Sequence, residues 1–161
     1  MYRATLETRA TSLDDDALAL AVGNAAFHSA ELYPVLIAFA PRLVTIISDS
    51  TVEPKTRSNA ALAMGNLLRN GDSNDPVLSQ SNACEVLLIA FHASWDILER
   101  RVILLSLGNF AGRPGCRKRL LEDHQDKLEA VLNESLTNED VEINNAARRI
   151  SEKLSRGIKK D

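Results

Sequence analysis

The sequence repeats one short pattern at intervals of 42 and 43 residues. The pattern runs leucine, small residue, aliphatic residue, glycine, asparagine, and it occurs at 20–25, 62–67 and 105–110. A weaker fourth copy follows, because Asn145–Ala147 repeats Asn59–Ala61 two periods later, although its glycine and asparagine have become Ser151 and Glu152. Units of about 40 to 47 residues are typical of helical solenoids, in which each unit packs on its neighbours. The chain is therefore expected to be one continuous array.

Composition favours helices throughout. Hydrophobic residues make up 45% of the chain but aromatic residues only 4%, so the apolar content is mostly leucine, alanine, valine and isoleucine. In the unit at 31–72, prolines and polar residues divide the chain into three expected helices. These are a short helix after Leu32, a second helix over 41–49 and a long third helix over 54–69. The fold class expected is all-α.

Other third helices are expected to begin after capping residues, whose oxygens accept hydrogen bonds from free amides of the first turn. The expected starts are Ser12 before the three aspartates at 14–16, Ser94 with Asp96, and the polar run at 137–140. The repeated glycines, Gly23, Gly65 and Gly108, then fall inside third helices. A glycine there costs about 1 kcal/mol relative to alanine, which indicates a close approach by a neighbouring helix or a partner.

This pattern resembles the armadillo repeat over nearly the whole chain. The resemblance implies a right-handed α-solenoid of three-helix repeats, with about three full repeats and an N-terminal partial one. The expected divisions are a partial repeat at 1–30 and repeats at about 31–72, 73–113 and 114–157, all in one domain spanning 1–161.

Two stretches narrow the resemblance. Residues 23–33 (GNAAFHSAELY) and 55–70 (KTRSNAALAMGNLLRN) are similar to the C-terminal armadillo region of the Fused family of serine/threonine protein kinases. The resemblance implies a non-catalytic part of a larger kinase. Kinases of this family are associated with Hedgehog signalling, with cilia and the axonemal central apparatus, and with kinesin-dependent cytokinesis in plants.

The resemblance also implies that third helices stack side by side along one surface. Asn24, Asn66 and Asn109 then form a row whose carboxamides can donate to and accept from an extended peptide backbone. The alternative is that each asparagine bonds to the backbone of the next unit and only ties the repeats together.

Leucines lie one turn before these asparagines, at Leu20, Leu62 and Leu105. Armadillo proteins that bind nuclear import signals carry tryptophan at these positions. With leucine instead, this chain lacks the aromatic rings on which lysine side chains of a basic signal would pack. A leucine row suits an amphipathic helix or a peptide with apolar anchors, and Phe27 and Arg69 stand one turn further on as specificity positions. The alternative is that the leucines are ordinary core between repeats.

No catalytic motif of a kinase is present, and no cofactor or metal site is expected. The glycine-rich stretch at 108–115 has no lysine at phosphate-binding distance after it, and Pro114 has no amide hydrogen, so a helix end and turn are expected there. His28, His92 and His124 fall at unrelated repeat positions, and Cys84 and Cys116 are expected to be free thiols.

Charge and hydropathy argue against two classes of partner. The net charge of −3 gives no general attraction to nucleic acid. The longest apolar runs are expected to be too short for a membrane span of about 18 residues. Basic residues gather in the C-terminal part of the chain, where they form either a solvated cap or a site for an acidic partner; they are Arg113, Arg117, Lys118, Arg119, Arg148, Arg149, Lys153, Arg156, Lys159 and Lys160.

The function expected is a protein-binding scaffold in a Fused-type kinase, acting in ciliary, flagellar or microtubule-linked signalling. The segment itself is not expected to be an enzyme. Expected partners are a kinesin-like or axonemal protein, or the chain's own kinase domain, with no nucleic acid and no membrane. One alternative is a structural or autoinhibitory segment that packs on the kinase domain. A third is an adaptor for basic import signals. The expected location is the cytoplasm, including the cilium or the cytoskeleton.

Overall fold

The computed structural model describes the backbone of residues 2–158 and the side chains of residues 14–156. Within that range the chain forms helices and no strands, which confirms the all-helical prediction. The helices are α1 (Tyr2–His28), η1 (Ala30–Leu32), α2 (Tyr33–Leu36), η2 (Ile37–Phe39), α3 (Ala40–Ser48), α4 (Pro54–Asn66), α5 (Asp75–Gln80), α6 (Ala83–Ala93), α7 (Ile97–Ala111), α8 (Pro114–Glu122), α9 (Gln125–Leu136) and α10 (Val141–Ile158).

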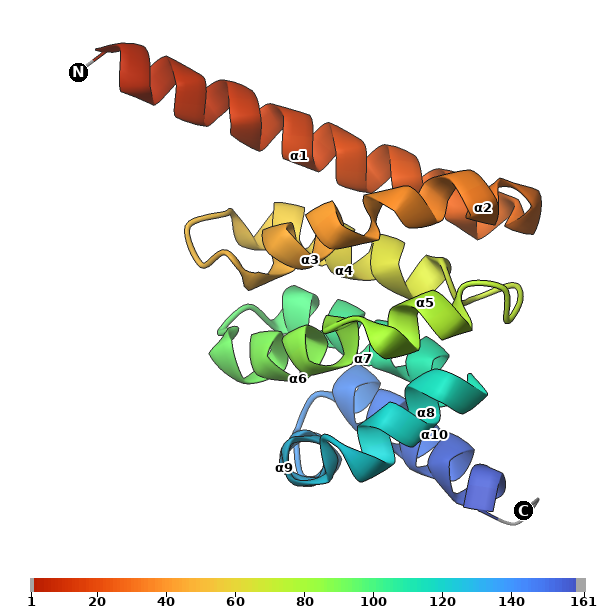
Figure 1. Cartoon of the computed structure of the whole chain (residues 1–161). Helices are drawn as coiled ribbons and strands as arrows, with labels where there is room; N and C mark the ends of the chain where they lie inside the picture. Colours follow the sequence, from red (N-terminus) through yellow and green to blue (C-terminus); the bar gives the residue numbers. More distant parts are fainter. Residues whose placement is uncertain (1, 159–161) are drawn as a thin grey trace.

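The long helices stack in the order of the sequence. Helix α4 packs between α1 and α7, and α7 packs between α4 and α10. A second layer covers this stack, because α3, α6 and α9 pack on α4, α7 and α10 and also on one another. Figure 1 shows the resulting progression from α1 at one end to α10 at the other. This consecutive packing is compatible with an α-solenoid.

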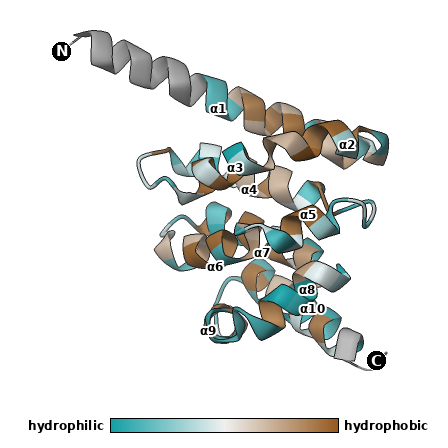
Figure 2. Cartoon of the chain, in the orientation of Figure 1, coloured by the Kyte–Doolittle hydropathy of each residue, from teal (hydrophilic) through white to brown (hydrophobic). Residues whose placement is uncertain are grey.

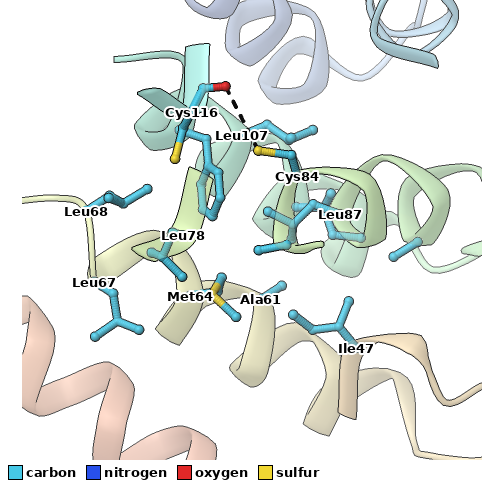
Figure 3. Packing of buried hydrophobic residues seen from close by; sticks show 14 of the residues in the cluster. Ile47, Ala61, Met64, Leu67, Leu68, Leu78, Cys84, Leu87, Leu107 and Cys116 are labelled. Atoms are coloured by element: carbon cyan, nitrogen blue, oxygen red, sulfur yellow. Dashed lines mark hydrogen bonds between the residues drawn. The ribbon is translucent and has the colours of Figure 1, made fainter. Parts of the chain in front are cut away.

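The space between the layers is filled with aliphatic side chains from several units. Met64, Leu87 and Leu107 have no exposed surface, and they meet in one continuous core (Figure 3). Alanines at Ala60, Ala61 and Ala63 let α4 approach its neighbours closely. Hydrophilic residues gather on α8 and α9 (Figure 2). The core therefore runs along the stack and joins the units laterally.

Two expected helix starts are confirmed. The carboxylate of Asp96 accepts a hydrogen bond from the Glu99 amide at 2.8 Å at the start of α7. The carboxylate of Asp140 accepts one from the Ile143 amide at 3.0 Å at the start of α10. In both helices a carboxylate satisfies a free donor of the first turn, as the sequence pattern indicates.

The expected start of α1 after Ser12 is wrong. Helix α1 begins at Tyr2, so the three aspartates lie in the middle of a helix. The side chains of the second and third aspartates bond to neighbouring helices instead of capping. Asp15 accepts from both the Nε and Nη2 of Arg42 in α3 at 2.6–2.9 Å, and Asp16 accepts from Asn59 in α4 at 2.8 Å. Tertiary partners therefore outweigh the local tendency of aspartate to begin a helix.

The third helix of the 31–72 unit also ends earlier than expected. The α-helical pattern stops at Asn66 rather than Arg69, and the chain continues in tighter turns, with the Leu68 amide bonded to the Gly65 carbonyl. The buried Tyr33 holds this end. Its hydroxyl donates to the Asn66 carbonyl at 2.6 Å and accepts from the Asn70 amide at 3.0 Å.

One described segment, Ala30–Ser48, is long and apolar enough to cross a membrane by length and composition, with a mean hydropathy of 1.6. The expectation that all apolar runs are too short is wrong for this segment. Its aliphatic residues outweigh Glu31 and Arg42 in the average. In the structure this segment is divided among four short helices, and Leu43, Ile46 and Ile47 lie in the protein core. Buried core helices of soluble proteins also meet this criterion of length and hydropathy.

The repeated glycines face the next helix of the stack. A Cβ atom on Gly65 would lie 2.8 Å from the Cα of Ser106 in α7, closer than real Cβ contacts. At Gly23 the nearest atom, in Ala63, is 3.4 Å away, and at Gly108 it is 3.8 Å away, in Ile150. Of the three positions, Gly65 is therefore the one at which the close approach of the next helix leaves no space for a side chain.

We expect Gly65→Ala to lower the free energy of unfolding by about 1 to 3 kcal/mol, because the added methyl group collides with the backbone of α7. The matched variant Gly108→Ala has room, so its greater helix propensity should leave stability unchanged or raise it by up to about 1 kcal/mol. Thermal melts followed by circular dichroism measure both. Equal shifts for the two variants would contradict the close-approach explanation.

Candidate functional site

Side chains of each long helix bond to the backbone of the previous one. The Asn66 amide nitrogen donates to the Gly23 carbonyl at 3.1 Å, and the Asn109 amide nitrogen donates to the Gly65 carbonyl at 3.1 Å. At the last step Lys153 takes this role, and its ammonium donates to the Gly108 carbonyl at 2.6 Å. We call this series the glycine ladder.

Lys153 could not be found from the period alone. A step of 43 from Asn109 leads to Glu152, and only the longer lysine side chain at the next position reaches the carbonyl. Burial lowers the pKa of Lys153, and the nearby charges of Arg113 and Arg149 lower it further. Its hydrogen bond places Lys153 among the ties between helices and removes it from the free basic residues of the C-terminal part.

A second series of ties joins the ends of the long helices. The Asn70 amide nitrogen donates to the Phe27 carbonyl at 3.1 Å. One period later, Arg113 donates to the Leu68 carbonyl at 2.7 Å and to the Arg69 carbonyl at 2.8 Å. Arg113 also pairs with Asp72 at 2.6 Å. Arg113 is therefore a link between units.

The asparagine row divides into two kinds of residue. Asn66 is 4% exposed and its amide is occupied by Gly23, while Asn109 is half-buried and bonded in the same way. These contacts match the alternative stated for the sequence, in which the asparagines bond to the backbone of a neighbouring unit and tie the units together. Asn24, by contrast, is exposed. Within the described part of the chain, Asn24 is the most exposed asparagine of this row.

The leucine row faces solvent. Leu20 is 42% exposed, Leu62 is 39% exposed and Leu105 is 51% exposed. Leucines of the core, such as Leu87 and Leu107, have no exposed surface. The three residues are therefore accessible to a partner.

A cleft of about 280 Å³ lies between α1 and α4 at one end of this row. It brings together six of the eight predicted site residues: Leu20, Asn24, Phe27, Leu62, Asn66 and Arg69. Leu105 and Asn109 lie on α7 and do not line it. The guanidinium of Arg69 stacks over the Phe27 ring, 4.0 Å from its centre, and holds a cation and an aromatic ring at the mouth of the cleft.

Further exposed residues continue the surface. The sequence pattern does not single out Lys55, Leu98 or Val141, and it places Arg148 among the basic residues of the C-terminal part. Leu98 is 60% exposed and Val141 is 69% exposed, and Lys55 and Arg148 are exposed as well. A seven-residue step along a helix returns to the same face, so Lys55 and Leu98 lie two turns before Leu62 and Leu105. We call the exposed residues of this face the ladder face: Leu20, Asn24, Phe27, Lys55, Leu62, Arg69, Leu98, Leu105, Val141 and Arg148.

The glycine-rich stretch at 108–115 is a helix end followed by a helix start, as expected. Helix α7 ends at Ala111, and α8 begins at Pro114. The amides of Gly115 and Cys116 donate to the two carboxylate oxygens of Asp75 at 2.7 and 2.8 Å. A Cβ atom on Gly115 would lie 2.9 Å from Asp75. A carboxylate of the chain itself therefore occupies the amides that a phosphate would need.

Comparison with known proteins supports the fold and no specific activity. No family model matches the sequence, and no curated protein matches it. Among solved structures, a crystal structure of an engineered protein from the Northeast Structural Genomics Consortium is similar, with a TM-score of 0.76 and 20% sequence identity. The similarity covers 88% of this chain and 57% of the engineered chain. At this identity the match concerns the helical arrangement alone.

We expect Asn66→Ala to lower the free energy of unfolding by about 1 to 2 kcal/mol, because it removes a buried hydrogen bond between two units. The matched variant Asn24→Ala changes an exposed residue of the same row and should alter stability by less than about 0.5 kcal/mol. Chemical denaturation of both variants measures the difference. If Asn66→Ala is as stable as the parent protein, the glycine ladder does not hold the units together.

Proposed function

We propose that this chain is a non-catalytic protein-binding scaffold, built as a right-handed solenoid of armadillo-type three-helix repeats. The 42 to 43 residue period and the glycine ladder support the repeat assignment, because the same contact recurs at each step of the stack. The observation that carries the function is the exposed leucine row beside the cleft. A protein in water retains an apolar row of this kind most readily where a partner covers it.

We further propose that the chain is the C-terminal region of a Fused-type serine/threonine kinase. The support is the sequence similarity at 23–33 and 55–70. The first stretch includes the C-terminal end of α1, and the second includes most of α4. In this role the ladder face recruits a ciliary, axonemal or kinesin-like protein. Packing on the kinase domain of the same protein would use the same face, and the experiment below separates the two.

An adaptor for basic import signals has less support. Leucines stand where aromatic platforms for lysine side chains would be required. The ladder face also presents Lys55, Arg69 and Arg148, which repel a basic peptide.

Replacing Leu62 with glutamate should abolish partner capture without unfolding the protein, because the carboxylate remains in contact with water. The matched control is Ile89→Glu, which changes another exposed aliphatic residue, on α6 in the second layer. Pull-downs with purified kinase domain and with ciliary extract, beside a circular-dichroism melt, measure both effects. If Leu62→Glu loses capture of the kinase domain alone, the face serves autoinhibition. If Leu62→Glu loses capture of a ciliary protein, the face serves recruitment.

Two results would contradict the proposal. An early, uncooperative melt of Leu62→Glu would assign the leucine row to the core. Equal partner capture by Leu62→Glu, Ile89→Glu and the parent protein would remove the ladder face from recognition.

The chain should bind no nucleotide and transfer no phosphate, because it lacks the phosphate-binding and base-positioning motifs of kinases. Isothermal titration calorimetry with Mg-ATP should give no binding heat. Saturable binding with micromolar affinity would show that the segment is more than a scaffold.

A further inference from the structure

We infer that the ladder face binds an acidic amphipathic helix that lies across α1, α4 and α7. The inference rests on the proposed function and names the class of partner. It follows from three properties of the face: the spacing of its exposed leucines, the charges beside them and the cleft at one end of the row.

The spacing of the leucines matches an α-helix. Leu20, Leu62 and Leu105 occupy the same register on three adjacent helices. Axes of packed helices are about 8 to 10 Å apart, so consecutive leucines are separated by about that distance. A helix laid across the row rises 1.5 Å per residue, so six or seven of its residues span one step, close to two helical turns. One face of such a helix can therefore contact all three leucines.

An extended strand fits this row less well. A strand rises about 3.3 Å per residue, so one step of the row corresponds to three residues. Side chains of a strand alternate between two faces, and residues three apart point in opposite directions. A strand would thus place every second anchor away from the leucine row.

The charges beside the leucines are those of a site for carboxylates. Lys55 lies near the start of α4 and Arg69 follows its end, so they flank Leu62 along the chain, and Arg148 lies on α10 in the register of Leu105. All three are exposed, and within the described part of the chain none of them forms an ion pair. The chain has a net charge of −3, so this basic character belongs to the face and not to the molecule as a whole.

Carboxylates near this face already have partners. Asp16 accepts hydrogen bonds from Asn59 and Thr56, and Glu152 lies 3.7 Å from Arg156. Arg148 donates a hydrogen bond to the Asn144 side chain, a neutral group, so within the described part of the chain none of the three cations has an acidic partner. A helix with apolar residues along one stripe and glutamates beside it satisfies both the leucines and the cations.

The cleft between α1 and α4 supplies an anchor point. Its walls include Leu20 and Leu62, and its volume of about 280 Å³ admits one large apolar side chain. At its mouth, Arg69 is held over the ring of Phe27 and can meet a carboxylate one turn along the bound helix from the apolar anchor. Asn24 provides an exposed donor and acceptor at the same place.

Three synthetic probes test the inference by fluorescence anisotropy with the full chain. The first is a helical peptide of about 21 residues with leucine at every seventh position and glutamates flanking the leucine stripe. The second replaces each glutamate with glutamine. The third keeps the acidic sequence but carries a central proline that breaks the helix.

The acidic helix should bind at least tenfold more tightly than either other probe. Arg69→Glu should weaken binding of the acidic helix about tenfold and weaken binding of the glutamine helix much less, since the glutamine helix has no carboxylate to pair with Arg69. Lys118→Glu makes the same charge change at an exposed site on α8 and serves as the matched control. Leu62→Glu should abolish binding of both helical probes.

Equal binding of the acidic and glutamine helices would overturn the charge requirement, and equal binding of the proline peptide would overturn the helical partner. If no probe binds but Leu62→Glu still loses its protein partner in pull-downs, the inference fails and the proposed function stands. If Leu62→Glu affects neither probes nor partner, both fail.

Discussion

The hydrogen bond from the Asn66 side chain to the Gly23 carbonyl is the contact on which the arrangement of the molecule depends. It recurs from Asn109 to Gly65 and from Lys153 to Gly108, so α4, α7 and α10 are each tied to the long helix before them. Glycine at the accepting position allows the close approach, and Gly65 leaves no room for a side chain. These ties fix the register of the stack, and the register aligns Leu20, Leu62 and Leu105 on one face.

Much of this arrangement could be predicted from periodicity. A fixed repeat length means that equivalent residues occupy equivalent places, so the stacked long helices and the leucine row could be predicted from three short matches. The starts of α7 and α10 were also predictable, because Asp96 and Asp140 act on amides only a few residues away. Helix caps and repeat periods can both be recognised in a single sequence, because each depends only on residues at short or fixed separations.

Individual contacts between residues far apart in the sequence could not be predicted from the sequence. The aspartates at 14–16 have the composition of a helix start, but Asp15 pairs with Arg42 and Asp16 with Asn59. Helix α4 ends early because Tyr33, far away in the sequence, holds the Asn66 carbonyl. Arg113 and Lys153 looked like members of a basic surface, yet each bonds to a neighbouring helix. In each case the partner was unknown until the fold brought it near.

The central claim is that the asparagines tie the helices together while the leucines remain free for a partner. Relaxation of protein signals by a soluble gadolinium chelate tests it directly in one NMR experiment. The account predicts strong relaxation of the methyl groups of Leu20, Leu62 and Leu105, and weak relaxation of the Asn66 side-chain amide. Protected leucine methyls together with a strongly relaxed Asn66 amide would contradict it, because the asparagines would then be the free groups and the leucines the packing.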